Sequence, residues 1–226
     1  MPVSFQPFWL TFQLAFTTTF VLFLIGIPIA AFLAFTSFRF KAVIEAIVGL
    51  PLVLPPSVLG FYLLLFFSPT GIIGHWLQTM FNIRLLFSFP GLVVASVIYS
   101  LPFMVQPVQA GLQSLPNNIK QASYTLGKSH LQTFLQVLLP NIKPALLTGI
   151  VLSFAHTIGE FGLVLMIGGN IAGKTRTVSI AIYDEVEALN YGTAHIYAII
   201  LLLLSFTILL IVYAVNKSMR SNIAGL

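Results

Sequence analysis

Long stretches without any charged residue divide the sequence, and they constrain its fold more than any other feature. No Asp, Glu, Lys or Arg occurs in residues 1–38, 46–83, 85–119, 144–159 or 188–216. A helix needs about 20 apolar residues to cross a bilayer, so each of the long stretches can hold at least one crossing. Only 7% of the residues are charged, whereas soluble domains contain about 25%. The sequence therefore predicts an all-α integral membrane protein.

About five transmembrane helices account for nearly the whole chain. We expect them at residues 11–36, 46–67, 90–112, 145–167 and 194–214. A transmembrane barrel is not favoured, because no alternating pattern of about ten residues recurs. The apolar run at the N-terminus is longer than the roughly 7–15 residues of a signal-peptide core, so we interpret it as a retained first helix. The connection 68–89 contains Pro, Gly, Trp and Arg residues and is interpreted as an interfacial loop.

Positive charges set the expected orientation. If the N-terminus lies outside, the inner segments hold seven basic residues, which are Arg39, Lys41, Lys120, Lys128, Lys143, Lys217 and Arg220. The outer segments then hold three, which are Arg84, Lys174 and Arg176. Inner loops of membrane proteins carry an excess of Lys and Arg, so we expect an outer N-terminus and a cytoplasmic C-terminus. The net charge of +5 then reflects membrane topology rather than binding to nucleic acid.

Prolines interrupt the second and third predicted spans. They are Pro51, Pro55 and Pro56 in one span, and Pro102 and Pro107 in the other. Each proline removes a backbone donor from a helix, and unpaired backbone groups in a membrane are tolerated only against protein or a water-lined cavity. The two spans are therefore either kinked for packing or line a pathway.

The longest inner connection, residues 113–143, has the pattern of two short helices. Ser114 and Pro116 suit the start of the first helix, as cap and first-turn residue. Gly127 is placed to end that helix in a left-handed turn. Ser129 with Gln132 resembles a capping box for the second helix, and Pro140 is expected to end it. The apolar stripe of this second helix consists of Leu131, Phe134, Leu135 and Leu138.

The amino-acid sequence of this connection resembles the cytoplasmic loop of ATP-binding-cassette (ABC) importer permeases. Gln121-Ala122-Ser123, Gly127 and Leu139-Pro140 stand where that family has Glu-Ala-Ala, a glycine and a Leu-Pro ending. The sequence departs from the family at Gln121, which replaces the acid, and at Ser123. Without the resemblance, the helical pattern alone would also suit an amphipathic connector that rests on lipid.

The resemblance implies that the connection docks on a separate ATPase subunit and transmits its closure. The residues implied in this coupling are Ile119, Gln121, Ala122, Leu126, Gly127, Leu139 and Pro140. It further implies a type I ABC importer permease fold over residues 9–214, which includes the loop 113–143, and a short cytoplasmic tail at 215–226. ATP would be hydrolysed by the partner subunit, so we expect no cofactor bound to this chain and no catalytic residue in it.

A glycine-rich outer segment imitates a nucleotide-binding motif. Residues 168–175, Gly-Gly-Asn-Ile-Ala-Gly-Lys-Thr, satisfy the P-loop pattern letter for letter. A true P-loop joins a strand to a helix within an α/β domain, whereas a membrane span precedes this segment. We therefore interpret it as an outer turn that presents backbone donors, with Gly168, Gly169, Asn170 and Gly173 as its candidate residues.

A second resemblance covers most of the chain and narrows the family. Residues 155–162, 168–171 and 173–177, together with 50–56, are similar to the molybdate permeases of ABC importers. The resemblance implies a multi-pass subunit of the cell inner membrane that forms the oxyanion pathway as a homodimer. Its implied partners are two cytoplasmic ATPase subunits and an extracytoplasmic molybdate-binding protein. Tungstate and sulfate permeases share related segments and stay open as alternatives.

Glu160 is the one carboxylate expected deep inside a span, where an ionised group costs roughly 2.5–3.5 kcal/mol. His156 precedes it by one helical turn, so the two share a face. Three roles stay open for the pair: structural hydrogen bonding, lining of the pathway, and acid–base catalysis in an intramembrane enzyme. The residues considered for the structural or pathway roles are Gln106, Ser153, His156, Thr157, Gly159 and Glu160. An ion-driven secondary transporter is a further alternative, and no residue is assigned to a metal.

Overall fold

The computed structural model describes residues 3–224. Within that range the regular structure is entirely helical, which confirms the predicted fold class. The elements are α1 (Gln6–Phe35), α2 (Lys41–Gly49), the 3-10 turn η1 (Leu50–Leu52), α3 (Pro56–Phe67), α4 (Ile72–Phe81), α5 (Phe89–Gln113), α6 (Asn117–Thr125), α7 (His130–Thr133), the π-helical turn η2 (Phe134–Leu138), α8 (Leu139–Asn141), α9 (Lys143–Gly159), α10 (Gly162–Gly168), α11 (Val178–Glu187) and α12 (Tyr191–Ala224).

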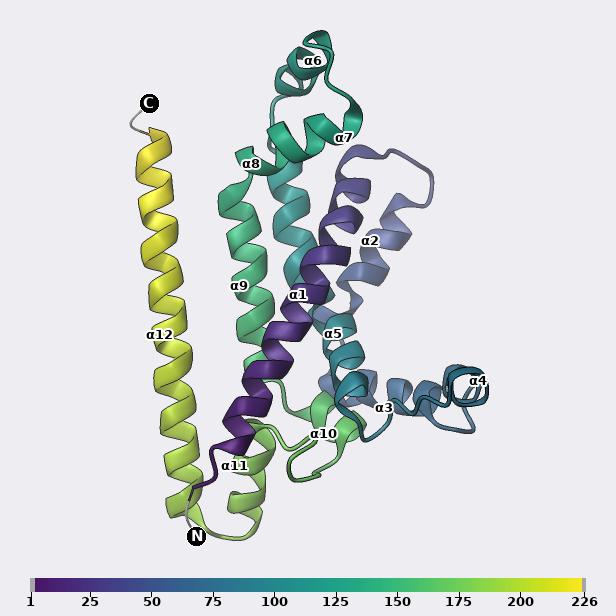
Figure 1. Cartoon of the computed structure of the whole chain (residues 1–226), viewed down its shortest axis with the longest axis vertical. Coiled ribbons are helices and arrows are strands. Elements are labelled where there is room, and N and C mark those ends of the chain that lie inside the picture. Colours follow the sequence, from purple (N-terminus) through teal and green to yellow (C-terminus); the bar gives the residue numbers. More distant parts are fainter. Residues whose placement is uncertain (1–2, 225–226) are drawn as a thin grey trace.

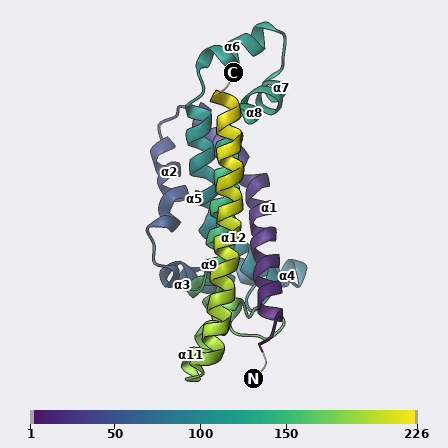
Figure 2. The ribbon, with the colours of Figure 1, turned by 90° about the vertical axis from the view of Figure 1, so that its left-hand side faces the viewer.

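Four long helices, α1, α5, α9 and α12, run along the length of the molecule (Figure 1). Helices α6, α7 and α8 gather at one end, which we call the elbow end, and α10 and α11 lie at the opposite or far end (Figure 1). Figure 2 shows the same lengthwise course of α5, α9 and α12 from the side. Helix α1 begins at the far end and α12 finishes at the elbow end, as expected for a chain whose termini lie on opposite sides of a membrane.

Three helices in the described range are long and apolar enough to cross a membrane alone: α1, α5 and residues 191–214 of α12. Two bent pairs raise the number of possible spans to five. One pair joins α2 and η1 to α3 at 109°, and the other joins α7 to α8 with α9 at 78°. The count agrees with the predicted five spans, but not every span is a straight helix.

The predicted span 46–67 is sharply bent, and its prolines explain the bend. Pro55 has an extended ψ of 138° and precedes Pro56, the first residue of α3. Neither proline can donate a backbone hydrogen bond, and a residue before proline is driven away from helical geometry. Helix α3 therefore turns across the bundle, toward α4 (Figure 1).

The predicted span 145–167 is broken rather than continuous. Helix α9 ends at Gly159, Glu160 has an extended ψ of 130°, and α10 begins at Gly162. The expectation that Glu160 lies inside a continuous helix is therefore wrong, because the residue forms the break itself.

Two connecting segments are more ordered than expected. The predicted interfacial loop 68–89 contains helix α4, which is followed by Asn82 as a C-cap in a left-handed conformation. The predicted cytoplasmic tail continues α12 as far as Ala224, and residues 225–226 lie outside the described residues.

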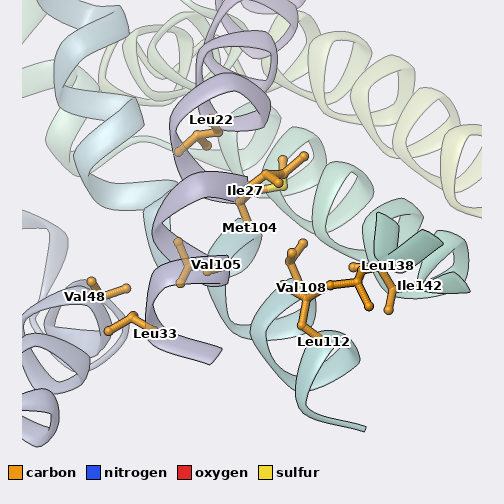
Figure 3. Close-up of a cluster of buried hydrophobic side chains, with 11 residues drawn as sticks. Leu22, Ile27, Leu33, Val48, Met104, Val105, Val108, Leu112, Leu138 and Ile142 are labelled. Atoms are coloured by element: carbon orange, nitrogen blue, oxygen red, sulfur yellow. The ribbon is translucent and has the colours of Figure 1, made fainter. Parts of the chain in front are cut away.

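The main core lies between α1 and α5 near the elbow end (Figure 3). Its buried side chains are Leu22, Ile27, Ala30, Leu33, Val48, Met104, Val105, Val108, Leu112, Leu138 and Ile142. Small residues bring neighbouring helices into contact here, as is usual in membrane bundles. A Cβ atom added to Gly111 of α5 would lie only 2.6 Å from the Cβ atom of Ala145 in α9.

We expect Gly111→Ala to lower the thermal unfolding midpoint in detergent, because the added methyl group separates α5 from α9. Overpacking of this kind costs about 1–3 kcal/mol. Gly192→Ala in α12 is the matched control, since an added Cβ there meets no atom of the described residues within 4 Å. Both changes gain about 1 kcal/mol of helix propensity, so their difference isolates the clash. Equal midpoints for the two variants would contradict the close packing.

Candidate functional site

The segment α6–α8 forms the expected elbow and exposes the residues predicted for coupling. Gln121 and Ala122 are exposed, and the Leu126 side chain is 79% exposed although it is apolar. Gly127 has φ +79°, which confirms the left-handed turn. Ile119 is half-buried. An exposed apolar tip on a rigid turn is a surface suited to a protein partner.

Side-chain hydrogen bonds hold the two arms of the elbow together. Ser123 and Thr133 are buried between the arms, with their hydroxyl oxygens 2.9 Å apart. The Tyr124 hydroxyl lies 2.7 Å from Nδ1 of His130. The capping box at Ser129 is present as predicted, because Gln132 N–H donates to its hydroxyl and the Gln132 side chain accepts from Ser129 N–H. The elbow is therefore a preformed unit.

The ends of the elbow differ from the expectation. Ser114 does not cap α6, because its hydroxyl donates to the Gly111 carbonyl at the end of α5, and Pro116 takes the capping position without a side-chain hydrogen bond. The expected apolar stripe is divided, since Leu131 and Leu135 are exposed whereas Leu138 is buried.

Pro140 does not end the second arm, which continues to Asn141 before α9 begins. Proline has no N–H to donate to the carbonyl one turn earlier, and the preceding residues 134–138 widen into a π-helical turn. Of the last predicted coupling residues, Leu139 is half-buried and Pro140 is exposed. They form the joint to α9 rather than the exposed tip.

The elbow is anchored to the membrane helices. The Lys120 ammonium lies 4.5 Å from the centre of the Phe35 ring at the end of α1, which is within the range of a cation–π contact. Leu138 and Ile142 are buried in the main core with α1 and α5 (Figure 3). A force on the elbow would therefore act directly on α1 and α5, which it contacts, and on α9, which follows it in the chain.

A second candidate site surrounds Glu160 at the break between α9 and α10. Oε2 of Glu160 accepts a hydrogen bond of 2.8 Å from the Ser96 hydroxyl in α5, and its backbone carbonyl accepts one of 2.7 Å from the Ser179 hydroxyl in α11. Oε1 is buried and has no hydrogen-bond partner among the described residues. These contacts make Glu160 a structural bridge between three elements.

His156 has its own partners on α5. Its Nδ1 atom lies 2.9 Å from the Ser100 hydroxyl. The centre of its ring lies 4.2 Å from that of Phe103 and 4.6 Å from that of Tyr99. His156 and Glu160 thus bond to different serines, rather than to each other. This geometry supports the structural and pathway roles over an acid–base pair.

The remaining predicted pathway residues lie in different environments. Thr157 is buried and donates 2.9 Å to the Ser153 carbonyl, while the Ser153 hydroxyl has no partner in the part of the chain that the structure describes. Gln106 is exposed on α5. Gln109, one turn further along, donates 2.7 Å to Glu45 of α2.

The glycine-rich turn folds its backbone donors inward. The N–H groups of Lys174, Thr175 and Arg176 all point to the Ile171 carbonyl, at 3.0 to 3.2 Å. Asn170 and Arg176 both bind Asp184 of α11, at 2.6 and 3.0 Å. These contacts close the second half of the turn on itself, whereas the display of backbone donors by Asn170 and Gly173 stays a prediction. Helix α10 rather than a strand precedes it, so a P-loop does not fit.

The structure adds a cavity that the sequence did not indicate. Its volume is about 550 Å³, and it is lined by Pro56, Ser57, Tyr99, Ala155, His156, Gly159, Glu160, Phe161 and Gly162. His156, Gly159 and Glu160 meet here as predicted neighbours, whereas Gln106, Ser153 and Thr157 do not line it. The serine partners Ser96 and Ser100 were missed, although their spacing on α5 equals that of His156 and Glu160.

The fold and the elbow together define a membrane permease of the ABC importer type. The structure resembles an inward-facing MetNI methionine ABC transporter with a TM-score of 0.73 at 18% identity, over 94% of each chain. It also resembles a bacterial alginate importer with a TM-score of 0.74 at 17% identity, over 95% of this chain and 80% of the other. Residues 26–221 match the model of the binding-protein-dependent transport system inner membrane component. The chain belongs to this family.

Curated relatives agree with this assignment. The molybdenum transport permease ModB of Azotobacter vinelandii is 49% identical over 208 residues, which cover 92% of each chain. A putative molybdenum transport permease of Bacillus subtilis is 34% identical, over 91% of this chain and 90% of the relative. The sulfate permease CysT of Escherichia coli is 35% identical, over 84% of this chain and 69% of the relative.

Family membership has direct consequences for the chemistry. The chain is a non-catalytic inner-membrane subunit, and ATP is hydrolysed by a separate subunit of the transporter. A binding protein delivers the substrate to transporters of this family.

We expect Ser96→Ala to destabilise the protein, because both carboxyl oxygens of Glu160 would then be buried without a partner. Loss of a partner for a buried polar group costs about 1–3 kcal/mol. Ser153→Ala is the matched control, since it removes a buried hydroxyl that has no hydrogen bond within the described chain. Thermal unfolding in detergent should show a lower midpoint only for Ser96→Ala. An equal effect of the two changes would show that the Ser96–Glu160 bond is not structural.

Proposed function

We propose that this chain is the permease subunit of an ATP-driven molybdate importer. The observation that carries the proposal is the 49% identity to a molybdenum transport permease over 92% of both chains. Identity over such a share of both chains leaves little room for a different architecture. The second molybdenum permease, from Bacillus subtilis, also spans nearly the same length.

We infer that two copies of the chain form the oxyanion pathway. The chain supplies one elbow, and a pair of ATPase subunits needs two. Polar side chains and exposed backbone at membrane depth must also contact another protein surface or water. Gln106, Ser57 and Gly159 are exposed in the single subunit, which supports a second copy or a water-filled path against this face. Two cytoplasmic ATPase subunits and an extracytoplasmic molybdate-binding protein complete the proposed complex.

The elbow is the proposed point of energy transfer. Leu126 and the residues around Gly127 dock on the ATPase, and closure of the ATPase pair moves the elbow as a unit. Because Ile142 is packed in the core beside the first turn of α9, this movement reaches α9 and then the break at Glu160. Selectivity then rests mainly with the binding protein, so the pathway can bind the anion weakly and release it.

Sulfate is the second candidate substrate, and a specific observation supports it. The sulfate permeases of Chlorella vulgaris and Escherichia coli are 36% and 35% identical to this chain over most of its length. Molybdate and sulfate are both tetrahedral dianions, so the permease alone need not discriminate between them.

Reconstitution tests the proposed function. The permease should copurify with an ATPase subunit and, in liposomes with the matching binding protein, should import molybdate only when ATP is present on the ATPase side. Tenfold excess sulfate should leave this uptake largely intact if molybdate is the substrate. ATP-independent uptake would contradict the ABC mechanism. Uptake of sulfate without uptake of molybdate would identify sulfate as the substrate instead.

Gly127 tests the docking elbow. Gly127→Val should strain the left-handed turn by roughly 1–2 kcal/mol and misplace Leu126, so that ATP hydrolysis continues while molybdate uptake falls. The strain is conformational rather than a clash, because an added Cβ meets no described atom within 4 Å. Gly127→Asn is the matched control, since asparagine tolerates this conformation. Equal coupling in the two variants would contradict the docking role of the turn.

A further inference from the structure

The cavity at the α9–α10 break joins three parts of the chain that are far apart in sequence. Ser57 comes from the first turn of α3 and Tyr99 from α5. His156 and Gly159 come from the end of α9, and residues 160–162 come from the break and the start of α10. The region lies where α3 meets α5 and α10 (Figure 1). The volume of about 550 Å³ is ample for a tetrahedral oxyanion with bound water. Gly159 keeps one wall open, since an added Cβ there meets no described atom within 4 Å.

The hydrogen-bond chain behind His156 fixes the direction of its protons. Thr157 donates its hydroxyl hydrogen to the Ser153 carbonyl, so the Thr157 oxygen can only accept from Ser100, which lies 3.2 Å away. Ser100 has a single hydrogen to give, and it must therefore accept from Nδ1–H of His156, at 2.9 Å. Nε2 takes no part in this chain.

This arrangement suits an imidazolium that faces an anion. When His156 holds a second proton, Nδ1–H keeps its bond to Ser100 and Nε2–H becomes free to donate, so no other group has to rearrange. An anion in a cavity of low dielectric constant strongly stabilises a cation beside it. Ser57 and Tyr99 line the same cavity, and each carries a hydroxyl group that can donate to an oxyanion oxygen.

Glu160 forms the buried part of the cavity wall. Its side chain is 5% exposed, Oε2 is held by Ser96, and Oε1 has no partner within the described residues. An ionised carboxylate would repel an oxyanion, so an oxyanion can lie beside Glu160 only while the carboxyl group holds a proton. Oε1 is the oxygen left free to hold it.

We propose that this cavity is a transit site for the oxyanion, where His156 supplies the positive charge and Ser57 and Tyr99 supply hydroxyl donors. The proposal rests on the proposed function, because it assigns a site along that pathway. The site binds the oxyanion weakly, because it offers few hydrogen-bond donors and one of its walls is open. It holds the anion between delivery at the far end and release at the elbow end.

The test adds a negative charge to the cavity without disturbing the fold. Ser57 is exposed in the first turn of α3, where a carboxylate is favoured by the helix dipole. In liposomes with the ATPase and binding protein, Ser57→Asp should slow molybdate uptake at least about tenfold relative to the isosteric Ser57→Asn, because only the charge differs. ATP hydrolysis stimulated by the loaded binding protein should persist in both variants. Thr70→Asp, which adds the same charge to the exposed turn between α3 and α4, should leave uptake unchanged.

Equal uptake by the Asp and Asn variants of Ser57 would overturn the transit site while leaving the proposed function intact. If the wild-type complex itself fails to import molybdate with ATP, the proposed function fails instead. His156→Gln provides a second measurement, because it removes the charge but keeps a donor toward Ser100. Uptake should fall in this variant at unchanged ATP hydrolysis, and undiminished uptake would also overturn the site.

Discussion

The absence of water inside a bilayer is the constraint on which the rest of this structure depends. Every backbone group that leaves a helix there must find a partner within the protein. At the break, the Ser179 hydroxyl provides such a partner for the backbone carbonyl of Glu160, and the Ser96 hydroxyl binds one oxygen of its side chain. The chain can therefore interrupt α9 at this point and place an irregular segment beside a cavity. The polar cluster of Ser96, Glu160 and Ser179 thus allows the helix to break and the cavity to form beside it.

The same constraint explains why the single subunit looks incomplete. The bend before α3 and the open wall at Gly159 face the same cavity, and both expose backbone that lipid cannot solvate. Gln106 adds an exposed polar side chain on α5. A second copy or a water-filled path satisfies these groups, whereas lipid does not. The exposed apolar side chains of α12 from Ile196 to Ile211 present no such demand and suit contact with acyl chains.

Features that are determined by residues close together in the sequence could be predicted from the sequence alone. The left-handed turn at Gly127 and the capping box at Ser129 follow from neighbouring residues, and the structure has both. The apolar runs likewise predicted the spans, although the structure bends the second and breaks the fourth. The break at Glu160 and the cavity could not be predicted in this way. They depend on contacts of Glu160 with Ser96 and Ser179, which are distant in sequence. The matching spacing of Ser96 and Ser100 with His156 and Glu160 was the one available clue, and it has meaning only once α5 and α9 are known to pack.

Helix α9 connects the two candidate sites mechanically. It starts at the joint of the elbow, where Ile142 is buried in the main core, and it ends at Gly159 on the cavity wall. Its 17 residues span about 25 Å, so a tilt imposed at one end appears at the other with little loss. Under the proposed function, α9 is therefore the element that carries a movement of the elbow to the hydrogen-bonded break at the cavity.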